Sequence, residues 1–144
     1  MSFFVSIKSN KMNTYCIIFI LAVAFLSGIE GMSEAERAMA DSLHKKCYPI
    51  SGATEAMINQ AREGNFSEDP AFKEHLYCMC KGYGIFKESG EVNIDVVQAI
   101  LQQKFQDPAL RDEVKAKCLV MKETPQETSL QSIKCLYDFK ENIL

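Results

Sequence analysis

The 144-residue sequence has no tryptophan, only two histidines and no excess of basic residues. Its 16 Lys and Arg against 19 Asp and Glu give a formal net charge of -3, whereas a nucleic-acid-binding protein would present a basic face. Two histidines leave few candidates for acid–base catalysis near neutral pH. Neither His44 nor His75 stands in a hydrolase motif, and we interpret both as ordinary surface residues. The sequence therefore predicts no nucleic acid partner, no catalytic residue and no enzyme.

Glycine-rich phosphate-binding loops are also missing, and we expect no cofactor. His75, Cys78 and Cys80 form a His-x-x-Cys-x-Cys cluster whose imidazole and thiolates would suit zinc. A fourth ligand is not evident, and the cysteines of exported proteins usually form disulfides. We therefore predict no metal site.

One long apolar run lies near the N-terminus, over residues 15–26 (YCIIFILAVAFL), with lysines before it and small residues after it. About a dozen apolar residues suit a secretory signal peptide, whereas a membrane-spanning helix takes about 20. We predict a signal peptide over residues 1–31, cleaved after Gly31 or, as a second choice, after Gly28. Residues 32–144 would then form a single secreted, extracellular domain. Met12 is an alternative start, because a complete signal follows it.

The mature chain shows no alternating strand pattern of useful length, but helix start signals recur along it. Ser33 with Glu36 forms a capping box for a helix that should end near Cys47. Five more helices are expected to begin after the capping residues Thr54, Asp69, Asn93, Asp107 and Thr124. The sequence thus predicts an all-α fold of about six short helices joined by short loops.

Five cysteines would remain after signal cleavage: Cys47, Cys78, Cys80, Cys118 and Cys135. Four of them can form two disulfides, and one is left over. In the helix after Asp69, Cys80 falls on the apolar face that contains Leu76, whereas Cys78 points away from that face. We therefore favour Cys80 as the bridged residue and Cys78 as the spare thiol, and the reverse assignment stays open. A spare thiol also permits a disulfide-linked homodimer.

The spacing of these cysteines resembles that of insect odorant-binding proteins of the pheromone-binding and general odorant-binding superfamily. There are 32 residues between Cys47 and Cys80, 37 between Cys80 and Cys118, and 16 between Cys118 and Cys135. These positions match the first, third, fourth and sixth cysteines of the family. An alignment through the Gly84-Ile85 and Gly90-Glu91 pairs would place the third family cysteine at Cys78 instead.

The second family cysteine would fall at Leu76 and the fifth near Gln126, and both are absent here. Their joint loss resembles the minus-C subgroup, which keeps two disulfides. The resemblance implies the bridges Cys47–Cys80 and Cys118–Cys135. In the family, a third bridge would connect the helix that begins after Asp69 with the helix that begins after Thr124. Its absence implies that the seam between these two helices is held by packing alone.

The resemblance further implies a secreted carrier of small hydrophobic ligands such as odorants, pheromones or lipid-like molecules. An olfactory role and a chemosensory receptor as partner are expected on the same basis. The alternative is a saposin-like helical protein that acts on lipids or membranes. The cysteine pattern of saposin-like proteins fits poorly with two features of this sequence, the long spacing after Cys47 and the isolated Cys135.

Large apolar residues at helical spacing form either a closed core or the wall of a central cavity. Six short helices need not pack closely at the centre, and we predict a hydrophobic cavity there. Tyr83 and Tyr137 are candidates to orient a hydroxyl or carbonyl of a guest. The residues expected to line the cavity are Met57, Leu76, Met79, Tyr83, Phe86, Val97, Ile100, Leu101, Leu119, Leu136, Tyr137 and Phe139.

Overall fold

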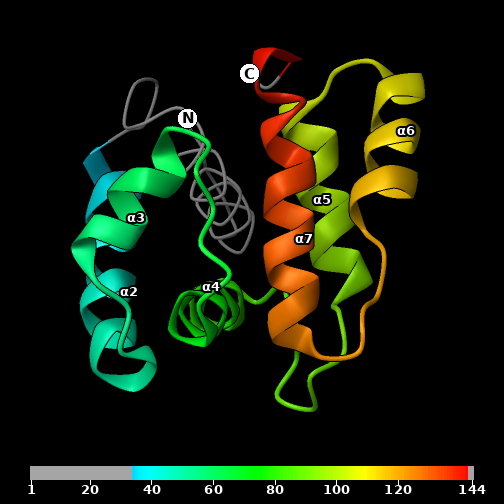
Figure 1. Cartoon of the computed structure of the whole chain (residues 1–144). Coiled ribbons are helices and arrows are strands. Elements are labelled where there is room, and N and C mark those ends of the chain that lie inside the picture. The colour runs from blue at the N-terminus through cyan, green and yellow to red at the C-terminus, as the bar shows by residue number, and fades with distance from the viewer. Residues whose placement is uncertain (1–33, 143–144) are drawn as a thin grey trace.

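The computed structural model describes residues 34–142 as an all-α fold, which confirms the predicted fold class (Figure 1). The helices are α2 (Glu34–Ser51), α3 (Glu55–Arg62), α4 (Pro70–Gly82), α5 (Ile94–Lys104), α6 (Pro108–Cys118), α7 (Pro125–Tyr137) and the short 3-10 helix η2 (Lys140–Asn142). The predicted signal peptide and Ser33 of the predicted capping box lie outside the described residues. Within residues 34–142, no helix has the length and hydropathy that a bilayer crossing requires.

The predicted helix starts are confirmed by the hydrogen bonds of their capping side chains. At each of the five capping residues, the side-chain oxygen accepts a hydrogen bond from a backbone N–H of the first turn. The amide of Ala71, for example, donates to the carboxylate of Asp69 at 2.8 Å. The first helix is longer than predicted, because α2 continues past Cys47 and Pro49 to Ser51. It ends where Gly52 adopts a φ of 79° and its amide donates to the carbonyl of Tyr48.

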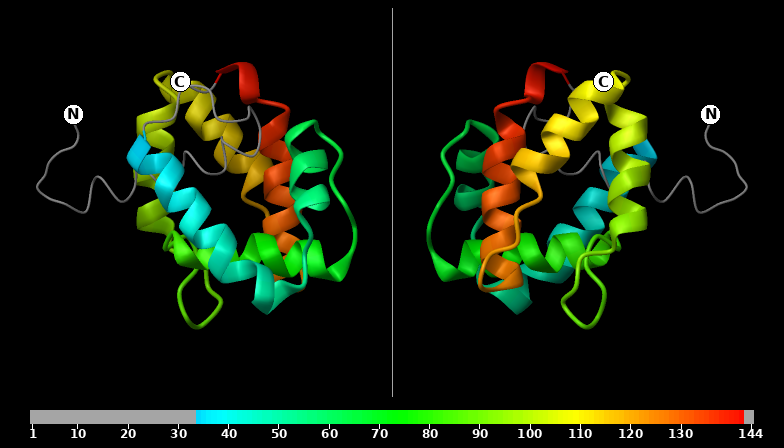
Figure 2. Two further views of the ribbon diagram at one scale, coloured as in Figure 1. Left: turned by 90° about the vertical axis from the view of Figure 1, so that its left-hand side faces the viewer. Right: turned by 90° about the vertical axis from the view of Figure 1, so that its right-hand side faces the viewer.

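Helix α4 is the central element of the fold. In Figure 1 it is seen end-on between α2 and α3 on one side and α5 and α7 on the other, and in Figure 2 it runs crosswise to α7. Its Met79, with Tyr83 just after its end, belongs to a core cluster with residues of α2, α5 and α6. Its Phe72 and Leu76 belong to a second cluster with residues of α3 and α7. These four residues share one side of the helix, whereas Cys78 lies on the other side and is also buried, against α2. Opposite faces of α4 are therefore both buried.

The close approach of α2 and α4 depends on a glycine. A Cβ atom added at Gly82, the last residue of α4, would lie only 2.6 Å from Cδ2 of Leu43 on α2. A larger residue at position 82 would force the Leu43 side chain out of its present position. The backbone of α4 is thereby held against α2 near the cysteines of both helices.

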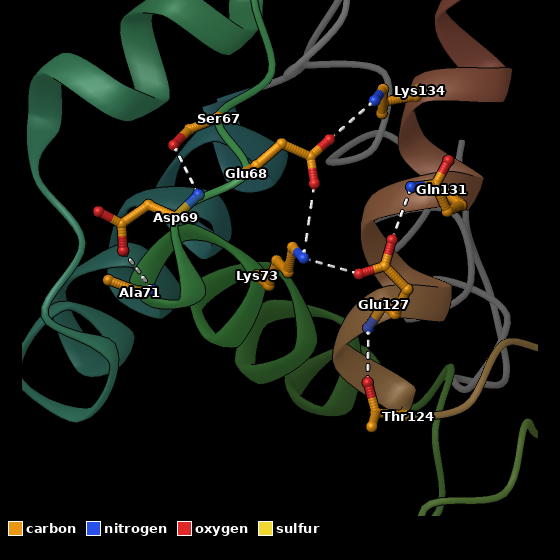
Figure 3. A network of polar contacts seen from close by, with 9 residues as sticks. All are labelled: Ser67, Glu68, Asp69, Ala71, Lys73, Thr124, Glu127, Gln131 and Lys134. Carbon is orange, nitrogen blue, oxygen red and sulfur yellow. Dashed lines mark hydrogen bonds and ion pairs between the residues drawn. The ribbon is translucent and has the colours of Figure 1, made fainter.

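The seam between α4 and α7 is held by ion pairs as well as by packing, so the prediction of packing alone was wrong (Figure 3). Lys73 of α4 lies 2.7 Å from Glu127 of α7 and 3.5 Å from Glu68, and Lys134 of α7 lies 3.1 Å from Glu68. Hydrogen bonds from Lys134 and from Lys73 lower the pKa of Glu68 and of Glu127, respectively. The network thus joins the chain before α4, α4 itself and α7.

Candidate functional site

A half-enclosed cavity of about 100 Å³ lies between α4, α5, α6 and α7. Its wall is almost entirely apolar, and the loop between α4 and α5 contributes to one side. The lining residues are Leu76, Met79, Cys80, Tyr83, Ile85, Phe86, Val92, Val97, Ile100, Leu101, Val114, Lys115, Cys118, Leu119, Thr128, Ser129, Ser132, Ile133 and Leu136. Each helix presents residues three and four apart to the cavity, as one face of an α-helix must.

Most of the residues that the sequence suggested for the wall lie at this cavity. The structure places Leu76, Met79, Tyr83, Phe86, Val97, Ile100, Leu101, Leu119 and Leu136 there. Their common property is a position on the inner face of a helix or just beyond its end. Whether they bind a ligand stays a prediction.

Three of the suggested residues lie elsewhere. Met57 packs against the second core cluster, on the α3 side of the molecule. Tyr137 lines a separate surface groove of about 440 Å³ next to Gly64, and its ring meets Phe66 edge-on with centroids 5.6 Å apart. Phe139 follows the end of α7 and packs, partly buried, against the first cluster. The suggested residues of α4 and α5 thus lie at the cavity, whereas Tyr137 and Phe139, at and beyond the end of α7, do not line it.

Sequence reasoning missed both apolar and polar residues of the wall. The apolar ones are Ile85, Val92, Val114 and Ile133, and the polar ones are Lys115, Thr128, Ser129 and Ser132. Thr128, Ser129 and Ser132 form a stripe on the inner face of α7. Their hydroxyls are used within the protein: Ser129 donates to the carbonyl of Pro125 at 2.8 Å, and Ser132 donates to the carbonyl of Cys118 at 2.7 Å. A signal for this stripe was the three-to-four spacing of small residues after Thr124, which does not stand out by hydropathy.

Tyr83 supplies an unsatisfied hydroxyl beside the cavity. The residue is 3% exposed, and its hydroxyl has no hydrogen-bond partner within residues 34–142. Burial raises the pKa of Tyr83 far above its ordinary value, so the phenol stays protonated at neutral pH. A buried hydroxyl without a partner is costly, and a guest or a water molecule with an acceptor atom would satisfy it.

The structure pairs Cys47 with Cys78 and leaves Cys80 as the free cysteine, so the preference for Cys80 as the bridged residue was wrong. The facial argument was sound in placing Cys80 on the inner face of α4, where it lines the cavity. Its error lay in assuming that only one face of α4 is buried, because Cys78 faces α2 and its cysteine. The second bridge, Cys118–Cys135, is as expected.

Free Cys80 is not a nucleophile at neutral pH. Burial raises the pKa of its thiol to about 12, and the hydrogen bond with Ser129 only partly offsets this effect. Because the thiolate is the reactive species, the thiol is inert in this environment.

Both histidines are buried, which corrects their interpretation as surface residues. His44 is 8% exposed and His75 is 0% exposed. Nδ1 of His44 lies 2.9 Å from Nε2 of His75, and Nδ1 of His75 lies 3.1 Å from the hydroxyl of Ser51, which also accepts the amide of Ala53. Burial lowers the pKa of both imidazoles from 6.5 to about 4. The pair is therefore a neutral, hydrogen-bonded link between α2 and α4.

A zinc site at His75, Cys78 and Cys80 does not form, because His75 is bonded to His44 and Ser51 and Cys78 is in a disulfide. In the part of the chain that the structure describes, no three His, Cys, Asp or Glu side chains are grouped to hold a metal ion.

Comparison with known proteins agrees with this architecture. Residues 31–138 match the PBP/GOBP family. The chain is 30% identical to the B2 protein of Tenebrio molitor over 121 residues, which cover 84% of this chain and 94% of that protein. It is 28% identical to the B1 protein of Tenebrio molitor over 123 residues, which cover 85% of this chain and 95% of that protein. No solved structure gives a significant match. The chain therefore belongs to the PBP/GOBP family of binding proteins, which are not enzymes.

Proposed function

We propose that the protein is a secreted carrier that binds small hydrophobic molecules in the cavity between α4, α5, α6 and α7. The observation that carries this proposal is an apolar cavity in which the hydroxyls of Ser129 and Ser132 are bonded within the protein and that of Tyr83 has no partner within residues 34–142. A guest gains free energy there by leaving water, at about 0.8 kcal/mol for each buried methylene group. Membership of the PBP/GOBP family supports the same function and favours it over a saposin-like activity.

The cavity volume limits the guest. A cavity of about 150 Å³ admits benzene, so the 100 Å³ described here takes a small molecule or one end of a longer one. Met79 lies in the wall, and its flexible thioether can change rotamer to admit more of a chain. We infer that affinity rises with chain length until the enlarged cavity is full.

Export and the subgroup are parts of the same proposal. The signal peptide predicted over residues 1–31 and the two disulfides support secretion, because disulfides persist outside the cytosol. Two bridges without a third fit the minus-C subgroup. An olfactory role, a receptor partner and a homodimer stay predictions.

Displacement of a neutral fluorescent probe, N-phenyl-1-naphthylamine, by straight-chain alcohols of increasing length tests the carrier function. Each added methylene should improve affinity by up to about fourfold until the cavity is full. Val97→Phe, which places a larger side chain in the wall, should weaken probe binding at least about tenfold, by steric exclusion. Ile94→Phe is the matched control, because Ile94 is on the same helix and 44% exposed.

Circular dichroism must show that both variants are folded, and Val92→Phe serves as a second cavity-filling variant if Val97→Phe is not. Absence of probe and alcohol binding to the unmodified mature chain would overturn the carrier function. Equal affinity in the unmodified chain and in a folded cavity-filling variant would place the binding site elsewhere.

A further inference from the structure

We propose that the preferred ligand is an anionic amphiphile, a medium-chain carboxylate, whose head group binds at Lys115 while its tail enters the cavity. This inference rests on the proposed function and deepens it by naming a ligand class. It depends on one cationic side chain in an otherwise apolar wall.

Lys115 is a half-buried residue of α6 that lines the cavity together with Val114, Cys118 and Leu119. Among the lining residues it alone carries a full charge at neutral pH, since Tyr83 and Cys80 are protonated and neutral. Almost no polar surface faces the cavity, so the aliphatic stem of Lys115 forms its part of the wall, and we infer that the ammonium group lies at the rim. The geometry is that of an apolar pocket with a positive charge at its edge.

The ammonium group of Lys115 is also uncommitted. Across residues 34–142 it takes part in no ion pair or hydrogen bond, although Asp112 lies one turn away on α6. Its neighbour Lys117, by contrast, lies 2.8 Å from Glu113. An unpaired cation beside an apolar wall matches a molecule with one carboxylate and a hydrocarbon tail.

The other polar groups of the wall carry no charge, and the buried Tyr83 hydroxyl, which lacks a partner within residues 34–142, offers only a neutral donor. The hydroxyls of Ser129 and Ser132 donate to backbone carbonyls, and Cys80 presents a neutral thiol. Leaving the ionised head inside the cavity would remove it from water without a counter-charge, which is strongly unfavourable. The head therefore belongs at the rim, beside Lys115. The chain's net charge of -3 provides no general attraction for anions, so a preference for carboxylates would be local.

The test compares octanoate, octan-1-ol and methyl octanoate as competitors of N-phenyl-1-naphthylamine at pH 7 and low salt, using the mature full-length chain. These molecules share a hydrocarbon tail and differ in the head group. Octanoate should bind about fivefold more tightly than octan-1-ol, the size expected for one rim ion pair. High salt should reduce that advantage, because it screens exposed charges.

Lys115→Met removes the charge and keeps the apolar stem, so the advantage of octanoate should disappear while octan-1-ol binds as before. Lys115→Arg should retain the advantage. Lys117→Gln is the matched control, because it removes one charge from the same helix at a residue outside the cavity wall.

Equal binding of octanoate and octan-1-ol, unaffected by Lys115→Met, would overturn the carboxylate preference and leave the carrier function standing. An equal loss of octanoate affinity in Lys115→Met and Lys117→Gln would also overturn it, since net charge would then explain the effect. Failure of all three molecules to displace the probe would instead count against the carrier function.

Discussion

Acidification from pH 7 to pH 5 should destabilise the fold through His44 and His75. Burial holds the pKa of both imidazoles at about 4, whereas their ordinary value is 6.5. Below pH 6.5 the unfolded chain therefore binds protons that the folded chain does not bind. The stabilisation from the neutral pair is complete above pH 6.5 and is lost as the pH falls from 6.5 to about 4.

The size of the effect follows from proton linkage. One imidazole shifted from 6.5 to about 4 costs about 2 kcal/mol of unfolding free energy at pH 5 and about 3 kcal/mol at pH 4. The two histidines titrate independently in the unfolded chain, so together they cost up to about twice that amount. Domains are stable by only about 5–15 kcal/mol, so a loss of this size is easily measured.

Urea unfolding followed by circular dichroism at pH 7, 6 and 5 is the assay, because the sequence has no tryptophan to report by fluorescence. The double variant His44→Gln/His75→Gln should abolish most of the dependence on pH, whatever its absolute stability. Glu68 and Glu127, whose pKa values are lowered from 4.5, contribute stability that is lost only at lower pH, so the range stays at or above pH 5. The whole chain has only these two histidines. An unfolding free energy that is unchanged between pH 7 and pH 5 would refute the reasoning.

Three further predictions concern the attachment of α2 to α4 and the cysteines beside it. Replacing Cys47 and Cys78 by alanine should cost about 3–4 kcal/mol, from the 31-residue separation of the bridged cysteines, as measured by urea unfolding. Cys80→Ala should leave both bridges intact, and alkylation with peptide mapping should label Cys80 only after unfolding; labelling of Cys78 would contradict the pairing. Gly82→Ala should destabilise by about 1–3 kcal/mol, because its Cβ would meet Leu43. Trimming Leu43 to alanine in the same chain should then cost less than it does alone, and additive losses in that double-mutant cycle would argue against the contact.

Local chemistry made the helix starts predictable. Thr54, Asp69 and Thr124 bond to amides two or three residues ahead, so their effect is contained in a few residues of sequence. The inner faces of α4 and α5 were predictable for a similar reason, since a period of 3.6 residues puts Leu76 with Met79 and Val97 with Ile100. The length of α2 was predicted less well, because the helix runs past the expected end near Cys47 to a glycine cap at Gly52.

Contacts between segments that are distant in the sequence could not be predicted from local residue patterns. The choice between Cys78 and Cys80 depended on α4 having two buried faces, one against α2 and one toward the cavity. The burial of His44 depended on a partner 31 residues away, His75, that satisfies its ring nitrogen. The ion pairs of Lys73 with Glu68 and Glu127 likewise join segments that only the packed fold brings together.

The sequence by itself determined an all-α chain with capped helices, apolar inner faces and enough cysteines for two bridges, because each of these depends on residue type and short-range spacing. The tertiary structure decided which cysteines pair, which polar groups are buried and where Lys115 meets the cavity. These outcomes depend on how whole helices cross, and that arrangement is set by the packing of many side chains at once rather than by any local pattern.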